Sequence, residues 1–287
     1  MSWTRAAADL KDRLLGKAFE LRGWVKWVVY SLLLINFGYY LWEEWVIAAH
    51  TLGADSTVLD WTTAFAATLE ELAWFLLLVL FELETSALPD EAFTPTVERS
   101  LHVGRLVAVL MLAHTVYAYV VYATDLERKV TVLPGVSSLC DLADQDAVFA
   151  LNMRYTTIDS QNCVELSDAD ELYQLIEEGV VTDRRGLTIE KQLGWIDVVE
   201  IMTWILIILT IEIEVWLQNR NVVGGPLMRA ANVSKMLLYG TLFLIMGAWA
   251  LLGQWVYVWD EFVWIAGFAV IEMNVVEWRD ELTEETA

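Results

Sequence analysis

Three apolar stretches of the chain carry glutamates in nearly the same places. Each stretch reads acid, tryptophan three or four residues later, an apolar run, and acid again. Their residues are Glu71, Trp74 and Glu82; Glu200, Trp204, Glu212 and Glu214; and Glu261, Trp264 and Glu272. A carboxylate inside hydrocarbon is costly and usually marks an ion path, a proton relay or an internal ion pair. We therefore expect an integral membrane protein that has charge to carry or to hold.

The apolar residues, 57% of the chain, are concentrated in long runs. A run of about 20 residues is the length of helix that crosses about 30 Å of hydrocarbon. The six candidate runs are 24–45, 62–83, 103–123, 194–216, 233–257 and 260–278. The predicted fold class is therefore all-α, a polytopic membrane protein with six transmembrane helices.

Basic residues set the expected orientation, because Lys and Arg collect in cytoplasmic loops. They crowd the N-terminal segment and the connections on the same side, so both termini are expected to be cytoplasmic, in a bacterial inner (plasma) membrane. The expected organisation is a basic amphipathic interfacial segment, helices one to three, an extracytoplasmic cap, helices four to six and an acidic cytoplasmic tail. The corresponding ranges are 1–23, 24–123, 124–193, 194–279 and 280–287.

The cap segment contains both cysteines of the chain, Cys140 and Cys163. In an oxidising compartment the natural interpretation is one disulfide that closes a small extracytoplasmic domain. Metal binding is the weaker alternative, because no histidine is near. The stretch 167–179 combines capping residues, a helical apolar spacing and a final glycine, and so predicts a helix.

A repeat is the second organising feature. Lys26, Arg105 and Lys235 each begin an odd-numbered helix at the inner face, while the acid–tryptophan–acid pattern lies on the even-numbered helices. This arrangement suggests three two-helix repeats, and internal repeats are frequent in transporters. Chance similarity is the alternative, because the chain contains 15 tryptophans and many glutamates.

Helical geometry places the two acids of an even helix on one face. Glu71 and Glu82 are 11 residues apart, which separates them by only about 20° around the axis. If three such stripes face a common axis, they form carboxylate rings, which select cations and can bind protons. The ion-path candidates are Glu71, Glu82, Glu200, Glu212, Glu214, Glu261, Glu272 and His114.

A structural explanation of the same acids stays open. Lys26, Arg105 and Lys235 lie at about the depth of the inner acids and could pair with them. Glu272 fits that explanation least well, because it lies near the middle of its span. His114 is mid-span and can titrate near neutral pH, although a hydrogen bond between helices is the commoner role of a buried histidine.

Composition also excludes several functions. The formal net charge of −22 leaves no basic surface for a nucleic acid. The acidic excess could attract cations to an entrance or reflect a salt-adapted host. No phosphate-binding loop or hydrolase motif is present, and the three histidines are far apart. We expect no enzyme activity and no cofactor.

The leading hypothesis is a channel or transporter for a proton or an inorganic cation. The alternative is a non-transporting accessory subunit, assembly factor or sensor that acts through its cap. The expected partners are the lipid bilayer, the transported ion, and a second copy or another membrane protein. A membrane enzyme ranks third.

Overall fold

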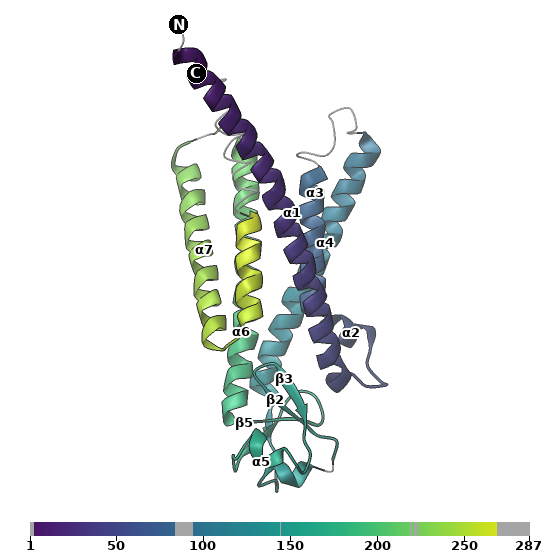
Figure 1. The fold of residues 1–287 in the computed structure, drawn as a ribbon. Coiled ribbons are helices and arrows are strands. Elements are labelled where there is room, and N and C mark those ends of the chain that lie inside the picture. The colour runs from purple at the N-terminus through teal and green to yellow at the C-terminus, as the bar shows by residue number, and fades with distance from the viewer. Residues whose placement is uncertain are drawn as a thin grey trace. The chain divides into compact units, whose positions relative to one another are not determined.

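The computed structural model describes residues 3–83, 94–143, 145–218, 220, 222 and 224–268, apart from the side chains of 3–23, 25, 26, 215 and 218 (Figure 1). The chain forms two compact units. One comprises Met1–Asn36 with Thr203–Ala287, and the other comprises Phe37–Met202. The boundary passes through two long helices, α1 (Trp3–Thr51) and α6 (Arg184–Gln218).

The Phe37–Met202 unit combines helices with a folded cap. Its helices are the end of α1, α2 (Val58–Ala64), α3 (Ala66–Glu82), α4 (Pro95–Arg128) and the start of α6. Helices α3 and α4 approach closely at Gly104, where a Cβ atom would lie 3.1 Å from the side chain of Leu80. A glycine at this position lets a leucine fill the space that a larger side chain would need.

The other unit consists of helices in its described part. They are the start of α1, the end of α6, α7 (Pro226–Leu251) and a helix over residues 255–268. Helix α7 begins with Pro226 after Gly225, whose φ of 97° favours glycine. Leu242, Ile245 and Trp249 form the buried side of α7.

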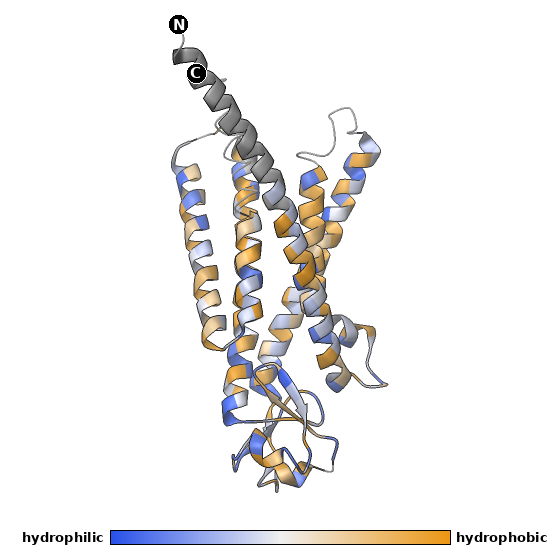
Figure 2. Ribbon diagram, viewed as in Figure 1, coloured by the Kyte–Doolittle hydropathy of each residue, from blue (hydrophilic) through white to orange (hydrophobic). Residues whose placement is uncertain are grey.

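Helices α4 and α7 are long and apolar enough to cross a membrane. Helices α2 and α3 would form a third span if they are taken together, although they meet at an angle of 73°. Apolar residues are frequent along these helices (Figure 2). Insertion into a membrane is consistent with this composition. The prediction of six spans goes further than the described helices show, in part because α6 carries three glutamates between residues 200 and 214.

The cap contains a five-stranded sheet, which the all-α prediction missed. Its strands are β1 (Thr131–Val132), β2 (Val148–Leu151), β3 (Arg154–Thr157), β4 (Leu172–Gln174) and β5 (Val180–Asp183). The order across the sheet is β1-β4-β5-β2-β3, with β2 and β5 parallel and the other pairs antiparallel. The described chain as a whole remains mostly helical.

The helix predicted over residues 167–179 is wrong. Part of this stretch forms β4, which pairs with β1 on one side and β5 on the other. The helical spacing of its apolar residues is outweighed by the backbone hydrogen bonds of two neighbouring strands and by complete burial of Leu172. Gly179, at a φ of 80°, ends the turn that leads into β5.

The cap has two small cores. The first gathers around the disulfide and the sheet; its buried residues are Leu139, Leu142, Ala147, Phe149, Ile158, Cys163, Leu172 and Val181. The second attaches the sheet to the helices; it contains Leu126 of α4, Ala150, Leu175 and Val180, with Leu187 of α6 packed against it. The cap is thus built directly onto the ends of α4 and α6.

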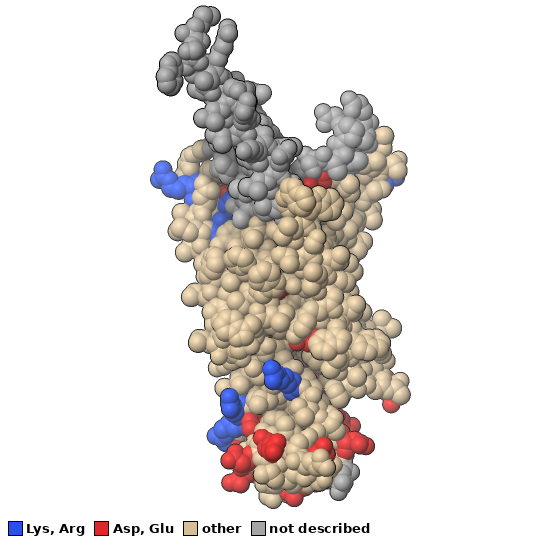
Figure 3. Space-filling model, in the orientation of Figure 1, with Lys and Arg blue, Asp and Glu red and all other residues tan. Residues whose placement is uncertain are grey.

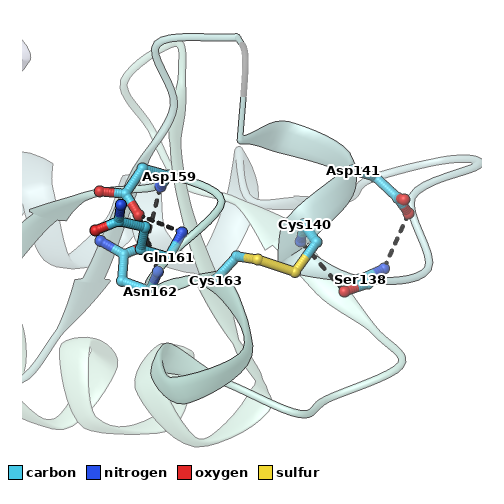
Figure 4. Close-up of a disulfide and its surroundings, with 7 residues drawn as sticks. All are labelled: Ser138, Cys140, Asp141, Asp159, Gln161, Asn162 and Cys163. Carbon is cyan, nitrogen blue, oxygen red and sulfur yellow. Dashed lines mark hydrogen bonds between the residues drawn. A yellow bond between two sulfur atoms is a disulfide. The ribbon is translucent and has the colours of Figure 1, made fainter.

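The structure contains the disulfide that the sequence predicts, between Cys140 and Cys163 (Figure 4). Cys140 lies in a short 3-10 helix, η3 (Leu139–Leu142), which is capped by Ser138 and Asp141. Cys163 begins α5 (Cys163–Leu166), after a turn in which Asp159 accepts hydrogen bonds from the backbone N–H groups of residues 161 and 162. Side-chain caps therefore hold both ends of the disulfide in place.

Candidate functional site

The break between α2 and α3 is held by side chains from two other helices. The carboxylate of Glu44 on α1 accepts hydrogen bonds from the backbone N–H groups of Ala67, at 2.7 Å, and Thr68, at 2.9 Å. The hydroxyl of Thr115 on α4 donates to the Ala66 carbonyl at 3.3 Å. The first turn of a helix leaves its N–H groups without helical partners and carries partial positive charge. The Glu44 carboxylate accepts from two of these N–H groups and places a negative charge beside them.

A second acid lies one turn further along α3. Glu70 accepts a hydrogen bond from the Tyr119 hydroxyl of α4 at 3.0 Å, and another from the Trp74 indole N–H at 3.2 Å. Tyr119 also interacts electrostatically with Glu44 and with Asp197 of α6. Four helices therefore contribute to one cluster of acids around a tyrosine, which we call the acid–tyrosine cluster: Glu44, Glu70, Tyr119 and Asp197.

Neutral groups donate hydrogen bonds to Glu44 and Glu70. In the described part of the chain, neither Glu44 nor Asp197 forms an ion pair with Lys or Arg. The charges that act on Asp197 are those of two other acids, Glu70 and Glu190. Carboxylates that interact with each other and with neutral donors can exchange a proton or hold a cation, whereas a tight ion pair leaves no site for either.

The other unit contains such an ion pair. Lys235 Nζ of α7 lies 2.7 Å from Glu214 Oε2 of α6, and both side chains are buried. Among described residues, no hydrogen bond reaches the second oxygen of Glu214. Desolvation of the two charges offsets much of the Coulomb energy of such a buried pair. Removal of one partner is strongly destabilising, because the other charge is then buried without a counter-charge. Its geometry indicates a structural role.

Two further acids of this unit accept hydrogen bonds from neighbouring helices. Asp260 accepts from the side-chain amide of Asn36 at 2.6 Å, and Glu261 accepts from the Trp204 indole N–H at 3.2 Å. Trp204, the tryptophan of the second acid–tryptophan stretch, thus donates to Glu261, the first acid of the third stretch. Both acids are buried, Glu261 to 2% exposure.

The remaining predicted residues lie in different environments. Glu71 is buried on α3, whereas Glu82, Glu200, Arg105 and His114 are half-buried. Glu212 is exposed on α6, on a different face from buried Glu214. Glu272 and the side chain of Lys26 lie outside the described residues.

Sequence reasoning did not select Glu44, Glu70, Asp197 or Glu190 as site residues. A signal for them exists in helical spacing. Glu190 and Asp197 are seven residues apart on α6, and Tyr119 and Tyr122 are three apart on α4, so each pair shares one face of its helix. Matching an acidic face on one helix to a tyrosine face on another would have indicated the cluster.

Comparison with known proteins finds no matching family, no similar curated protein and no similar solved structure.

Proposed function

We propose that this chain is a six-helix membrane protein that conducts or exchanges protons, or inorganic cations, through its intramembrane carboxylates. The observation that supports the proposal most is the acid–tyrosine cluster. Four helices bring Glu44, Glu70 and Asp197 around Tyr119, and the backbone, indole and hydroxyl groups that donate to Glu44 and Glu70 are neutral. Among the described residues, Glu44 and Asp197 form no ion pair with Lys or Arg. Acids without a counter-charge cost free energy in a membrane interior and are typical of ion and proton pathways.

The broken helix pair α2–α3 adds a second argument. Broken helices in transporters expose backbone groups at the place where ions bind, and neighbouring side chains satisfy the groups that the ion does not use. Here the break faces Glu44 and Thr115. Protonation of Glu44 would weaken its hydrogen bonds to α3, so a proton at this site is coupled to the geometry of the break.

In this proposal the protein lies in a bacterial inner membrane with both termini in the cytoplasm and the cap outside. The disulfide fits an oxidising space. Reporter fusions at Asp90 and Ala169 test the arrangement, because they should report opposite sides of the membrane. Reports from the same side would contradict the six-span topology.

The test of transport is proton and cation flux in vesicles reconstituted with the purified protein. We expect Glu70→Gln and Asp197→Asn to reduce flux strongly while unfolding temperature changes little, because both variants retain shape and hydrogen-bonding ability. Glu212→Gln is the matched control, since Glu212 is exposed on α6, and it should leave flux unchanged. Transport that both cluster variants leave intact would remove the cluster from the path.

The alternative is a non-transporting accessory subunit, assembly factor or sensor. The ion pair of the α7-containing unit favours it, because buried Glu214 and Lys235 join α6 to α7 and leave no carboxylate for an ion. The cap would then contact a partner, and acidic side chains gather over its surface (Figure 3). A wild-type protein that moves neither protons nor monovalent or divalent cations would establish this alternative over transport.

A further inference from the structure

The acid–tyrosine cluster continues from α3 toward the cap. Tyr119 and Tyr122 lie on one face of α4, and their hydroxyls interact with acids on one face of α6. The Tyr119 hydroxyl donates a hydrogen bond to Glu70 at 3.0 Å, and the Tyr122 hydroxyl donates one to Glu190 at 3.5 Å. Asp197 acts on both tyrosines through its charge. These interactions link Glu70, Tyr119, Asp197, Tyr122 and Glu190.

Helix geometry sets the spacing of the two acids on α6. Seven residues correspond to a rise of about 10.5 Å. Asp197 and Glu190 are therefore too far apart along the helix for direct proton transfer, so a group between them has to relay the proton. A tyrosine hydroxyl both donates and accepts hydrogen bonds, which is what a proton relay requires.

Glu190 lies at the base of the cap. Its side chain is 3% exposed. One oxygen accepts from the Tyr122 hydroxyl at 3.5 Å, and the other accepts from the backbone N–H of Met153 at 3.3 Å. Asn152 and Met153 form the tip of the β2–β3 hairpin with φ values of 53° and 65°. Glu190 thus connects α4, through Tyr122, to the β2–β3 hairpin, through Met153.

The groups around Glu190 are acids and tyrosines. Tyr122 faces it from α4, Tyr155 from β3, Glu177 from the turn before β5, and Asp197 from its own helix. Burial raises the pKa of Glu190 above its usual range, and burial also raises the pKa of Glu177. No Lys or Arg forms an ion pair with Glu190 in the described part of the chain.

We propose that Glu190 is the outer proton acceptor of the path, and that the Tyr122 hydroxyl relays the proton to it from Asp197. Tyr122 gives its hydroxyl proton to the Glu190 carboxylate as its oxygen takes the proton of the Asp197 carboxyl group, and for this step the Asp197 carboxyl group has to move into hydrogen-bond distance of Tyr122. Asp197 ends as the carboxylate and Glu190 as the acid, while Tyr122 is unchanged and no electron moves. The cap then acts as the outer port of the path. This inference rests on the proposed function.

A purely structural role for Glu190, as the residue that holds the hairpin tip, makes a different prediction. In that case Glu190→Gln lowers cap stability, but Tyr122→Phe leaves transport unchanged, because Met153 keeps its bond to Glu190. The relay requires the hydroxyl of Tyr122 itself. The matched control is Tyr117→Phe, which removes an exposed tyrosine hydroxyl from the same helix.

The experiment compares proton flux in reconstituted vesicles, and carboxyl infrared difference spectra between acid and neutral pH, for the wild type and these three variants. Glu190→Gln and Tyr122→Phe should each lower the initial proton flux by roughly a hundredfold or more, the scale expected for loss of a proton-transfer group. Glu190→Gln should also remove one carboxyl band that titrates above the usual range, and Tyr117→Phe should match the wild type.

Four results would overturn the inference. Wild-type flux in Tyr122→Phe would remove the relay, whatever Glu190→Gln does to folding. An unchanged carboxyl spectrum in a folded Glu190→Gln protein would remove Glu190 as the acceptor. Absence of flux in the wild type would end both this inference and the proposed function. Flux that responds to Glu70→Gln and Asp197→Asn, but not to Glu190→Gln or Tyr122→Phe, would overturn this inference and support the proposed function.

Discussion

At the residue scale, the chemical type of an acid's partner separates structural carboxylates from candidate functional ones. Glu214 is paired with Lys235 at 2.7 Å and buried with it. Asp197 instead interacts with two other acids and two tyrosines. The first arrangement holds helices together, while the second leaves a carboxylate whose charge can change. Sequence position alone does not distinguish them, because both acids lie in apolar surroundings on α6.

The Lys235–Glu214 pair gives a prediction at this scale. Lys235→Met should lower the free energy of unfolding by about 3–5 kcal/mol, because it leaves a buried carboxylate without its counter-charge. The double variant with Glu214→Gln should recover much of that loss. Denaturant unfolding in detergent micelles measures both, and Arg229→Met, an exposed position on the same helix, is the control. Additive losses in the double-mutant cycle would show that the two residues are not coupled.

At the scale of elements, the bend between α2 and α3 has a cause outside both helices. No proline or glycine lies between residues 58 and 82, so the usual local reasons for a sharp bend are absent. The bend is accommodated because Glu44 accepts from the freed N–H groups and Thr115 donates to the freed carbonyl. Helix α3 therefore begins where α1 and α4 supply its missing partners.

Removal of that cap should loosen the first turn of α3. Glu44→Ala should cost about 0.5–2 kcal/mol, as is typical for loss of a helix cap. Amide hydrogen exchange at Ala67 and Thr68 should become faster, while exchange in α7 stays unchanged. Glu212→Ala, which removes an exposed acid, should leave both regions as they are. Protected amides at Ala67 and Thr68 in the Glu44 variant would show that another group caps α3.

At the scale of the whole molecule, the cap and the helices are stabilised by different forces. The cap has small cores, a five-stranded sheet and a disulfide. Helix insertion follows from apolar length and lipid partitioning. The two parts meet in the Phe37–Met202 unit through Leu126, Leu187 and the bonds of Glu190.

Loss of the disulfide should therefore affect the cap selectively. Replacement of Cys140 and Cys163 by serine should lower cap stability by about 3 kcal/mol, from the chain entropy of the loop that the bond closes. Limited proteolysis should cut between residues 129 and 183 sooner, while helical circular dichroism and membrane insertion are retained. Loss of the helical circular dichroism at the same temperature at which the cap unfolds would show that the two parts unfold together. Thiol labelling of the unreduced wild type should give no signal.

The sequence by itself determined that some helices are long and apolar enough to cross a membrane, that the chain is mostly helical and that the two cysteines pair, because run length, composition and cysteine count report these properties locally. Only the tertiary structure decided that residues 172–174 form a strand, since that depends on pairing with β1 and β5. The same holds for the candidate site. Glu44, Glu70, Asp197 and Glu190 are separated by up to 153 residues in the chain, and a carboxylate becomes a site only through the groups that the fold places beside it.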